Sequence, residues 1–187
     1  MHPSEAMKDR TIGWLGNVAQ QAAGVGEIGL DPSYSSTDEE SAQMTIFRGQ
    51  LEVAERAGKP VQVHSRNAEK RVLEVLGTYH LKSILMHWLE NGDILPMAGD
   101  RGCYISFGPA LLYSKRLQQM ALRYDPRLVL VESDSPVTFK VLGGVRGPSL
   151  VPSAAFRLAE LWGKPFADTL SAVTDNSLRY VKGSSKG

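Results

Sequence analysis

The sequence has little of several features that would place it in a particular class of protein. It contains one cysteine, Cys103, so an internal disulfide is impossible and a reducing compartment is expected. No apolar run approaches the ~20 residues needed to span a bilayer, so we expect no membrane segment. The N-terminal residues also lack the basic and then apolar pattern of a signal peptide. These absences predict a cytoplasmic protein.

The chain also lacks a strong charge of either sign. Its formal net charge is +1, so bulk charge gives no argument for nucleic acid as a partner. It does not exclude nucleic acid, because a local basic rim is enough to hold phosphates. No internal repeat or low-complexity segment is visible. With 187 residues, 42% of them hydrophobic, we expect a single domain over residues 1–187 with a substantial core.

Apolar runs alternate with helical patterns along the chain. Five runs indicate strands, at 25–30, 61–64, 83–86, 103–107 and 128–131. Segments with apolar residues at helical spacing lie around 4–23, 37–57, 67–76, 94–98, 114–124, 153–162, 166–173 and 176–181. This alternation is typical of βαβ units and a parallel sheet, and it fits both an open doubly wound sheet and a closed barrel.

Polar side chains can begin several of these helices. Thr37-Asp38-Glu39-Glu40 has the pattern of a capping box. Asn67, Ser114 and Ser153 are expected to cap the helices that follow them, because their side chains can accept hydrogen bonds from first-turn N–H groups.

Metal-capable side chains decide between the two architectures. They lie in or directly after four different strands and are Glu27, His64, His87 and Asp134. A TIM-type barrel builds its active site at the C-terminal ends of many strands, whereas an open sheet uses one switch point. We therefore expect a TIM-type (β/α) barrel with a metal site at one rim.

This mixed set of imidazoles and carboxylates suits Zn, Mn, Fe or a pair that includes Mg. Glu27 could bridge two cations, and Asp134 could bind one cation and also take the proton from an attacking water. Each residue alone has a structural alternative: a histidine after an apolar strand can be a hydrogen-bonded rim residue, and Glu27 could satisfy a buried arginine. Glu132, which points to the same side as Asp134, could pair with a cation inside the barrel.

Three further residues are candidates for binding substrate. Arg66 could grip a phosphate with its planar fork, or it could be a solvated arginine at a helix start. Trp88 could stack a nucleobase, or it could pack against a neighbouring loop. Arg146 lies in a glycine-rich loop and could reach a phosphate. That loop lacks the spacing of a Walker loop or a dinucleotide fingerprint, so no nucleotide cofactor is implied.

At these residues the chain resembles the TatD family of metal-dependent deoxyribonucleases, within the amidohydrolase-like TIM barrels. Gly26-Glu27-Ile28-Gly29-Leu30-Asp31 is similar to the bridging-glutamate motif of that family. Pro60 to Arg66 matches its Pro-Val-x-x-His-x-Arg motif, and Val131 to Pro136 resembles its Glu-Thr-Asp-x-Pro motif. His87 falls where the family has a histidine followed by an aromatic residue, and Met1-His2-Pro3 looks like the end of its Gly-x-His-Pro strand.

The resemblance implies a function. Glu27, His64, His87 and Asp134 would be metal ligands for up to two divalent ions, Zn, Mg or Mn. Metal-activated water would hydrolyse phosphodiester bonds in DNA. The alternatives are an amidohydrolase-like enzyme that acts on a small ester or amide, and a catalytically weak remnant or binding module with an incomplete metal site.

Two departures from the family pattern stand out. After His87 the sequence continues Trp88-Leu89-Glu90-Asn91-Gly92 rather than with a Phe-x-Gly turn, and no His-x-His pair occurs anywhere. The resemblance therefore implies an incomplete barrel, with about five of eight strands readable and the N-terminal strands absent. The chain could be truncated, it could be a natural remnant, or another chain could supply the missing segment.

Overall fold

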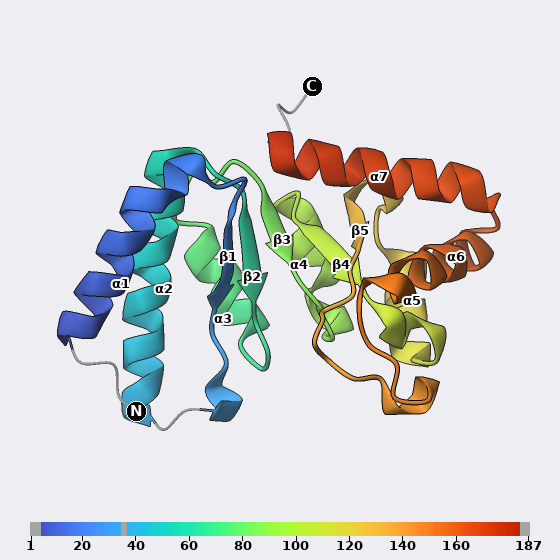
Figure 1. Ribbon diagram of the computed structural model, residues 1–187, viewed down its shortest axis with the longest axis horizontal. Coiled ribbons are helices and arrows are strands. Elements are labelled where there is room, and N and C mark those ends of the chain that lie inside the picture. Colours follow the sequence, from blue (N-terminus) through green and yellow to red (C-terminus); the bar gives the residue numbers. More distant parts are fainter. Residues whose placement is uncertain (1–4, 35–36, 184–187) are drawn as a thin grey trace. The chain divides into compact units, whose positions relative to one another are not determined.

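The structure is a computed structural model that describes residues 5–34 and 37–183. The chain divides into two compact units, which we describe separately. The first unit contains Met1–His87 and Tyr180–Gly187, and the second contains Trp88–Arg179. Across the described ranges, strands and helices alternate in the order that the sequence predicts (Figure 1). The prediction of a single domain over residues 1–187 stays a prediction.

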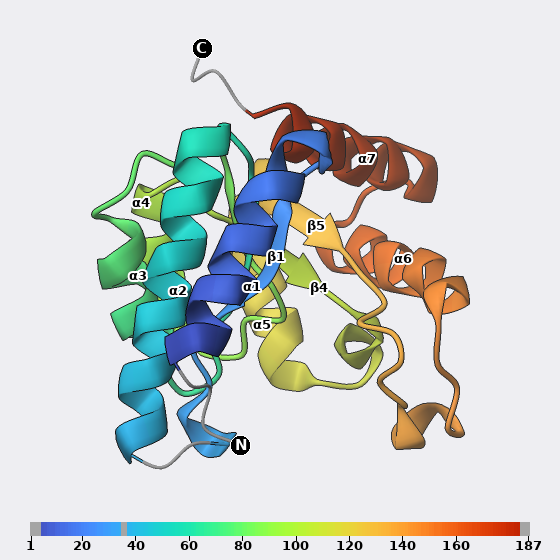
Figure 2. The same cartoon turned by 60° about the vertical axis from the view of Figure 1, so that its left-hand side comes forward.

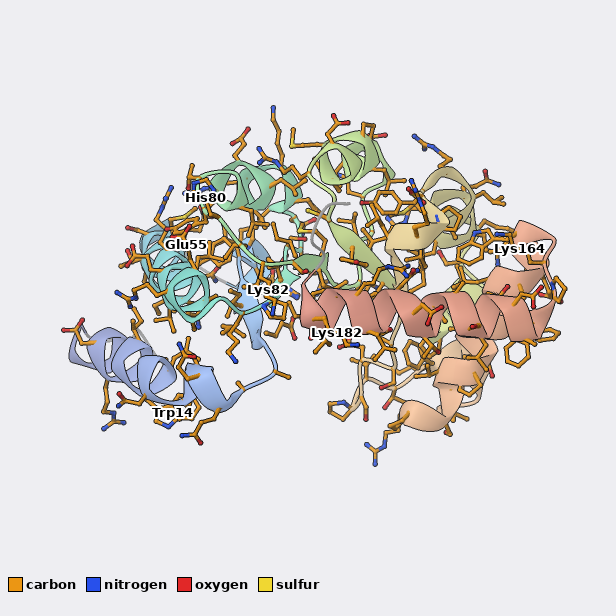
Figure 3. The ribbon with its side chains drawn as sticks, turned by 90° about the horizontal axis from the view of Figure 1, so that it is seen from above. Trp14, Glu55, His80, Lys82, Lys164 and Lys182 are labelled. Atoms are coloured by element: carbon orange, nitrogen blue, oxygen red, sulfur yellow. The ribbon has the colours of Figure 1, made fainter. Side chains whose placement is uncertain are left out.

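Three parallel strands form the sheet of the first unit. They are β1 (Val25–Gly29), β2 (Val61–His64) and β3 (Ile84–Met86), and β2 pairs with both of the others. Its helices are α1 (Glu5–Val18), α2 (Thr37–Ala57) and α3 (Glu69–Leu76). α1 lies beside α2, and α2 packs against β1 (Figure 2). Figure 3 shows Trp14 projecting from α1 on the side away from α2.

The core of the first unit consists of the apolar faces that the sequence pattern predicts. Its fully enclosed side chains include Val61 and Val63 of β2, Phe47, Leu51 and Ala54 of α2, and Val72 and Leu73 of α3. The alternation in β2 buries both valines and turns Gln62 and His64 toward the other face. His64 therefore ends the strand with its side chain outside the valine core.

Two parallel strands lie in the second unit. β4 (Tyr104–Phe107) pairs with β5 (Val129–Val131), with Phe107 opposite Val131. The helices of this unit are α4 (Leu95–Asp100), α5 (Lys115–Arg123), α6 (Val151–Trp162) and α7 (Phe166–Lys182), whose last three residues belong to the first unit. Ser114 caps α5 as predicted, because its side chain accepts a hydrogen bond from the Leu117 N–H group.

Three predictions about helix boundaries were wrong. α7 is one continuous helix rather than two pieces; the Asn176 amide that was expected near a break donates to the carbonyls of Pro126 and Val129 and ties the helix down. α6 begins at Val151, so Ser153 lies inside it. Asn67 does not cap α3: it has a left-handed φ of 56° and donates to the Ser33 hydroxyl instead. The capping box at residues 37–40 falls largely on side chains outside the described set.

No helix in the described ranges is long and apolar enough to cross a membrane.

Gly29 is the residue that lets β1 and β2 meet at their ends. It pairs with His64 in the parallel register, and the N–H of the next residue, Leu30, donates to the His64 carbonyl at 3.1 Å. A Cβ atom at Gly29 would lie 1.9 Å from that carbonyl oxygen, and the φ of Gly29 is +145°. The position therefore excludes every residue with a side chain.

We predict that Gly29→Ala destabilises the protein by about 3 kcal/mol, because overpacking and the disallowed φ both act at this position. The free energy of unfolding in urea measures the effect. Gly13→Ala is the matched control: a Cβ added to this exposed glycine of α1 would have nothing within 4 Å, and alanine there should stabilise by about 0.5–1 kcal/mol. Equal stabilities of the two variants would contradict the close contact.

Cys103 packs inside the second unit. It is 0% exposed, and burial raises the pKa of its thiol to about 12. We predict that the native protein reacts with a thiol reagent at pH 8 on the order of 100-fold or more slowly than the urea-unfolded chain, since the thiolate is the nucleophile. Equal rates in the native and unfolded states would show that the thiol is accessible.

Candidate metal centre

Three of the four predicted ligands meet in the first unit. Glu27 lies in β1, His64 ends β2, and His87 directly follows β3. The C-terminal ends of parallel strands lie at the same edge of a sheet. As a result, one ligand atom of each of the three residues lies within 4.8 Å of the others. The His87 N–H group donates to the Val63 carbonyl at 3.1 Å, so the main chain that carries this imidazole is fixed against β2.

One carboxylate oxygen joins the two imidazoles. Glu27 Oε1 lies 2.9 Å from His64 Nδ1 and 2.8 Å from His87 Nε2. The two imidazole centroids are 5.7 Å apart. The exposed fraction of the side chains rises from 4% at His87 to 33% at His64 and 43% at Glu27. His87 therefore forms the buried floor of the cluster, and Glu27 forms the side that faces solvent.

The donor set fits a divalent cation. Ligand atoms about 2.0–2.1 Å from a tetrahedral zinc ion lie roughly 3.3 Å from one another. The distances from Glu27 Oε1 to the two imidazole nitrogens, 2.8 and 2.9 Å, are close to that spacing. The ligand atoms of all three residues lie within 4.8 Å of one another. Imidazole nitrogen with carboxylate oxygen suits Zn and Mn. Among the residues that the structure describes, Glu27, His64 and His87 form a group that can hold a metal ion. The carboxylate of Glu27 contacts these two imidazoles rather than an arginine in that part of the chain.

A second carboxylate, Asp31, contacts the other side of the His64 ring. Its Oδ2 lies 2.9 Å from His64 Nε2, and its Oδ1 accepts the Ser33 N–H group at 3.0 Å. Burial raises the pKa of the Asp31 carboxyl, but hydrogen bonds from His64 and Ser33 outweigh burial, so the pKa lies below its ordinary value. Sequence reasoning assigned no role to Asp31. One feature of the sequence could have indicated this role: Asp31 is a carboxylate two residues beyond Gly29, and Gly29 is the residue that pairs with His64.

Asp134 lies in the second unit, in the segment that follows β5. It is half-buried, and its φ of 46° is left-handed, which is uncommon for a residue with a side chain. Its role as a fourth ligand stays a prediction. Arg66 is exposed just beyond β2, and Arg146 is exposed in the glycine-rich loop of the second unit, so both are accessible to a ligand in solution.

Trp88 is held at both its main chain and its ring. Its N–H group lies 3.2 Å from the Ser106 hydroxyl and 3.1 Å from Glu132 Oε1. Its ring stacks on Phe139 with centroids 5.8 Å apart and an interplanar angle of 11°. Glu132 thus accepts a hydrogen bond from the main chain directly after His87. Phe139, in the segment after β5, covers part of the Trp88 ring.

Comparison with known proteins gives the family of this chain. The sequence matches the family described as TatD related DNase over residues 1–182. It is 25% identical over 167 residues to the human protein named deoxyribonuclease TATDN3, and 25% identical over 192 residues to the Bacillus subtilis protein named uncharacterized metal-dependent hydrolase YabD. These alignments cover 87% and 97% of this chain, respectively. The chain spans 61% of the human protein, 54% of its mouse counterpart and 75% of YabD.

Solved structures show the same fold. The crystal structure of YJJV, a TatD homolog from Escherichia coli, superposes with a TM-score of 0.79 over 96% of this chain and 71% of that chain, at 22% identity. The expectation of an α/β fold of the TatD barrel type is therefore confirmed. Since the family match extends over nearly the whole sequence, this chain belongs to the TatD related DNase family.

Proposed function

We propose that this protein is a divalent-metal-dependent hydrolase that cleaves phosphodiester bonds in DNA. The observation that carries the proposal is that Glu27, His64 and His87, which lie in or directly after three parallel strands, each place one ligand atom within 4.8 Å of the others. Membership of a family described as TatD related DNase supports it, as does the deoxyribonuclease name of the human relative.

The chemistry follows from the donor set. A divalent cation held there would act as a Lewis acid for a phosphoryl oxygen and would activate water as the nucleophile. Glu27, His64 and His87 would hold the ion, and we propose Zn, Mn or Mg, with up to two ions at the site. Asp134 is the proposed fourth ligand and the proposed acceptor of the proton from the attacking water.

The substrate contacts are also proposals. Arg66, an exposed residue two positions beyond His64, would bind a backbone phosphate through its planar fork. Arg146 would add a second phosphate contact, and Trp88 would stack a base. We further propose a cytoplasmic location, on the grounds of the single buried Cys103.

We predict cleavage of a labelled single-stranded DNA oligonucleotide in the presence of Mg²⁺, Mn²⁺ or Zn²⁺ and loss of cleavage with a chelator. His64→Ala, His87→Ala and Asp134→Ala should each lower the rate on the order of 100-fold or more, because each removes a ligand. His80→Ala is the control, since His80 is an exposed histidine outside the cluster and should leave the rate unchanged.

The same assay separates the alternatives. Cleavage of an RNA oligonucleotide in preference to DNA would change the substrate class. Hydrolysis of a small phosphodiester or ester without cleavage of either polymer would favour a small-molecule hydrolase. No hydrolysis with any cation, in a folded chain, would rule out the enzyme and leave a binding module.

Metal binding can be measured apart from catalysis. We predict that Zn²⁺ or Mn²⁺ at 100 times its Kd stabilises the folded protein by about 2.7 kcal/mol, because the ion binds the native state. Thermal unfolding with and without the ion measures this change. His87→Ala should abolish the stabilisation, and His80→Ala should retain it. Equal stabilisation of both variants would place the ion elsewhere.

A further inference from the structure

We propose that Asp31 is the positioning residue for His64: it holds the ring so that Nδ1, and not Nε2, faces Glu27 and a cation. The use of this arrangement rests on the proposed metal-dependent function. Its test measures zinc binding and the position of the ring proton, not catalysis.

The first step is the placement of the His64 ring between two carboxylates. Nδ1 lies 2.9 Å from Glu27 Oε1, and Nε2 lies 2.9 Å from Asp31 Oδ2. The two carboxylates differ in exposure, since the Asp31 side chain is 15% exposed and the Glu27 side chain is 43% exposed. The more enclosed carboxylate therefore anchors the ring, and the more open one shares its oxygen with His87.

The second step is that Asp31 is itself held at every polar group. Its N–H group donates to Gln43 Oε1 at 2.9 Å, and its carbonyl accepts from Gln43 Nε2 at 3.1 Å. Its second carboxylate oxygen accepts the Ser33 N–H group at 3.0 Å. Gln43 belongs to α2, which packs against β1. The helix thus fixes the main chain of Asp31, and Asp31 fixes the imidazole.

The third step concerns the proton on the ring. An ionised carboxylate can only accept hydrogen bonds, so His64 Nε2 donates to Asp31. Glu27 Oε1 faces Nδ1 in the same way, at 2.9 Å, so without a cation both ring nitrogens have a carboxylate to which they can donate. A cation that replaces the proton on Nδ1 would leave the other proton on Nε2, where Asp31 accepts it. His87 instead directs Nε2 toward the same oxygen, at 2.8 Å. The two histidines would therefore bind a cation through different nitrogens.

Asp31 is distinct from the ligands. The three ligand atoms that lie within 4.8 Å of one another come from Glu27, His64 and His87. Asp31 contacts the opposite nitrogen of the His64 ring. A carboxylate that accepts from the far nitrogen of a ligating histidine fixes its tautomer and raises its basicity, and loss of such a partner typically weakens metal binding about 10- to 100-fold.

The test reads the tautomer and the metal affinity separately. Nitrogen-15 NMR of the imidazoles, on the protein loaded with Zn²⁺, should show His64 bound through Nδ1 with its proton on Nε2. In Asp31→Asn, whose amide can also donate, this preference should be lost, and the Kd for Zn²⁺ should rise about 10- to 100-fold by titration calorimetry. Glu74→Gln is the control: it removes the same charge from an exposed site on α3 and should change neither quantity.

The outcomes separate this inference from the proposed function. A proton on Nδ1 of His64 in the Zn²⁺-loaded native protein would overturn the inference, as would an Asp31→Asn variant that folds and keeps the tautomer and the Kd of the native chain. Gln43→Ala, which keeps the carboxylate but frees its main chain, should also weaken Zn²⁺ binding, though by less. If Asp31→Asn weakens Zn²⁺ binding and loses the Nε2 proton, but the native protein cleaves no substrate with any cation, the positioning role stands and the proposed function fails.

Discussion

The close approach of two main chains at Gly29 is the constraint on which the site depends. The Leu30 N–H group meets the His64 carbonyl at 3.1 Å, where a Cβ at Gly29 would lie 1.9 Å from the same oxygen. This contact sets how far β1 lies from β2 at their ends. Glu27 and His64 therefore come within hydrogen-bonding distance, and the Val63 carbonyl, which accepts the His87 N–H group, brings His87 to the same edge.

The three side chains around the His64 ring differ in exposure. The Glu27 side chain is 43% exposed, the Asp31 side chain 15% and the His87 side chain 4%. Glu27 and Asp31 come from β1 and the residues just beyond it, and His87 comes from the end of β3. Polar groups that lose water cost free energy unless they are paired, and Glu27 and Asp31 provide that pairing for the two nitrogens of His64.

Local patterns were enough to predict the strands and the three side chains that meet at their edge. The valines of β2 and the glycines around Glu27 mark buried strands that end on chelating side chains, and parallel strands bring such ends together. Asp31 could not be assigned, because its contact with His64 depends on the register between β1 and β2. The break expected near Asn176 failed for a similar reason: the carbonyls that hold its amide lie about 50 residues away, at Pro126 and Val129.

The glycine at position 29 also separates two properties of the site. The spacing between the three side chains is set by main-chain atoms of β1 and β2. A substitution at position 29 cannot change this spacing without moving the strands apart. The chemical hardness of the donor atoms depends on the side chains at positions 27, 64 and 87. The strands pair through their main chains, so these side chains are not required for the pairing. Exchange of a donor would therefore change which cation is preferred while the frame that holds it stays the same.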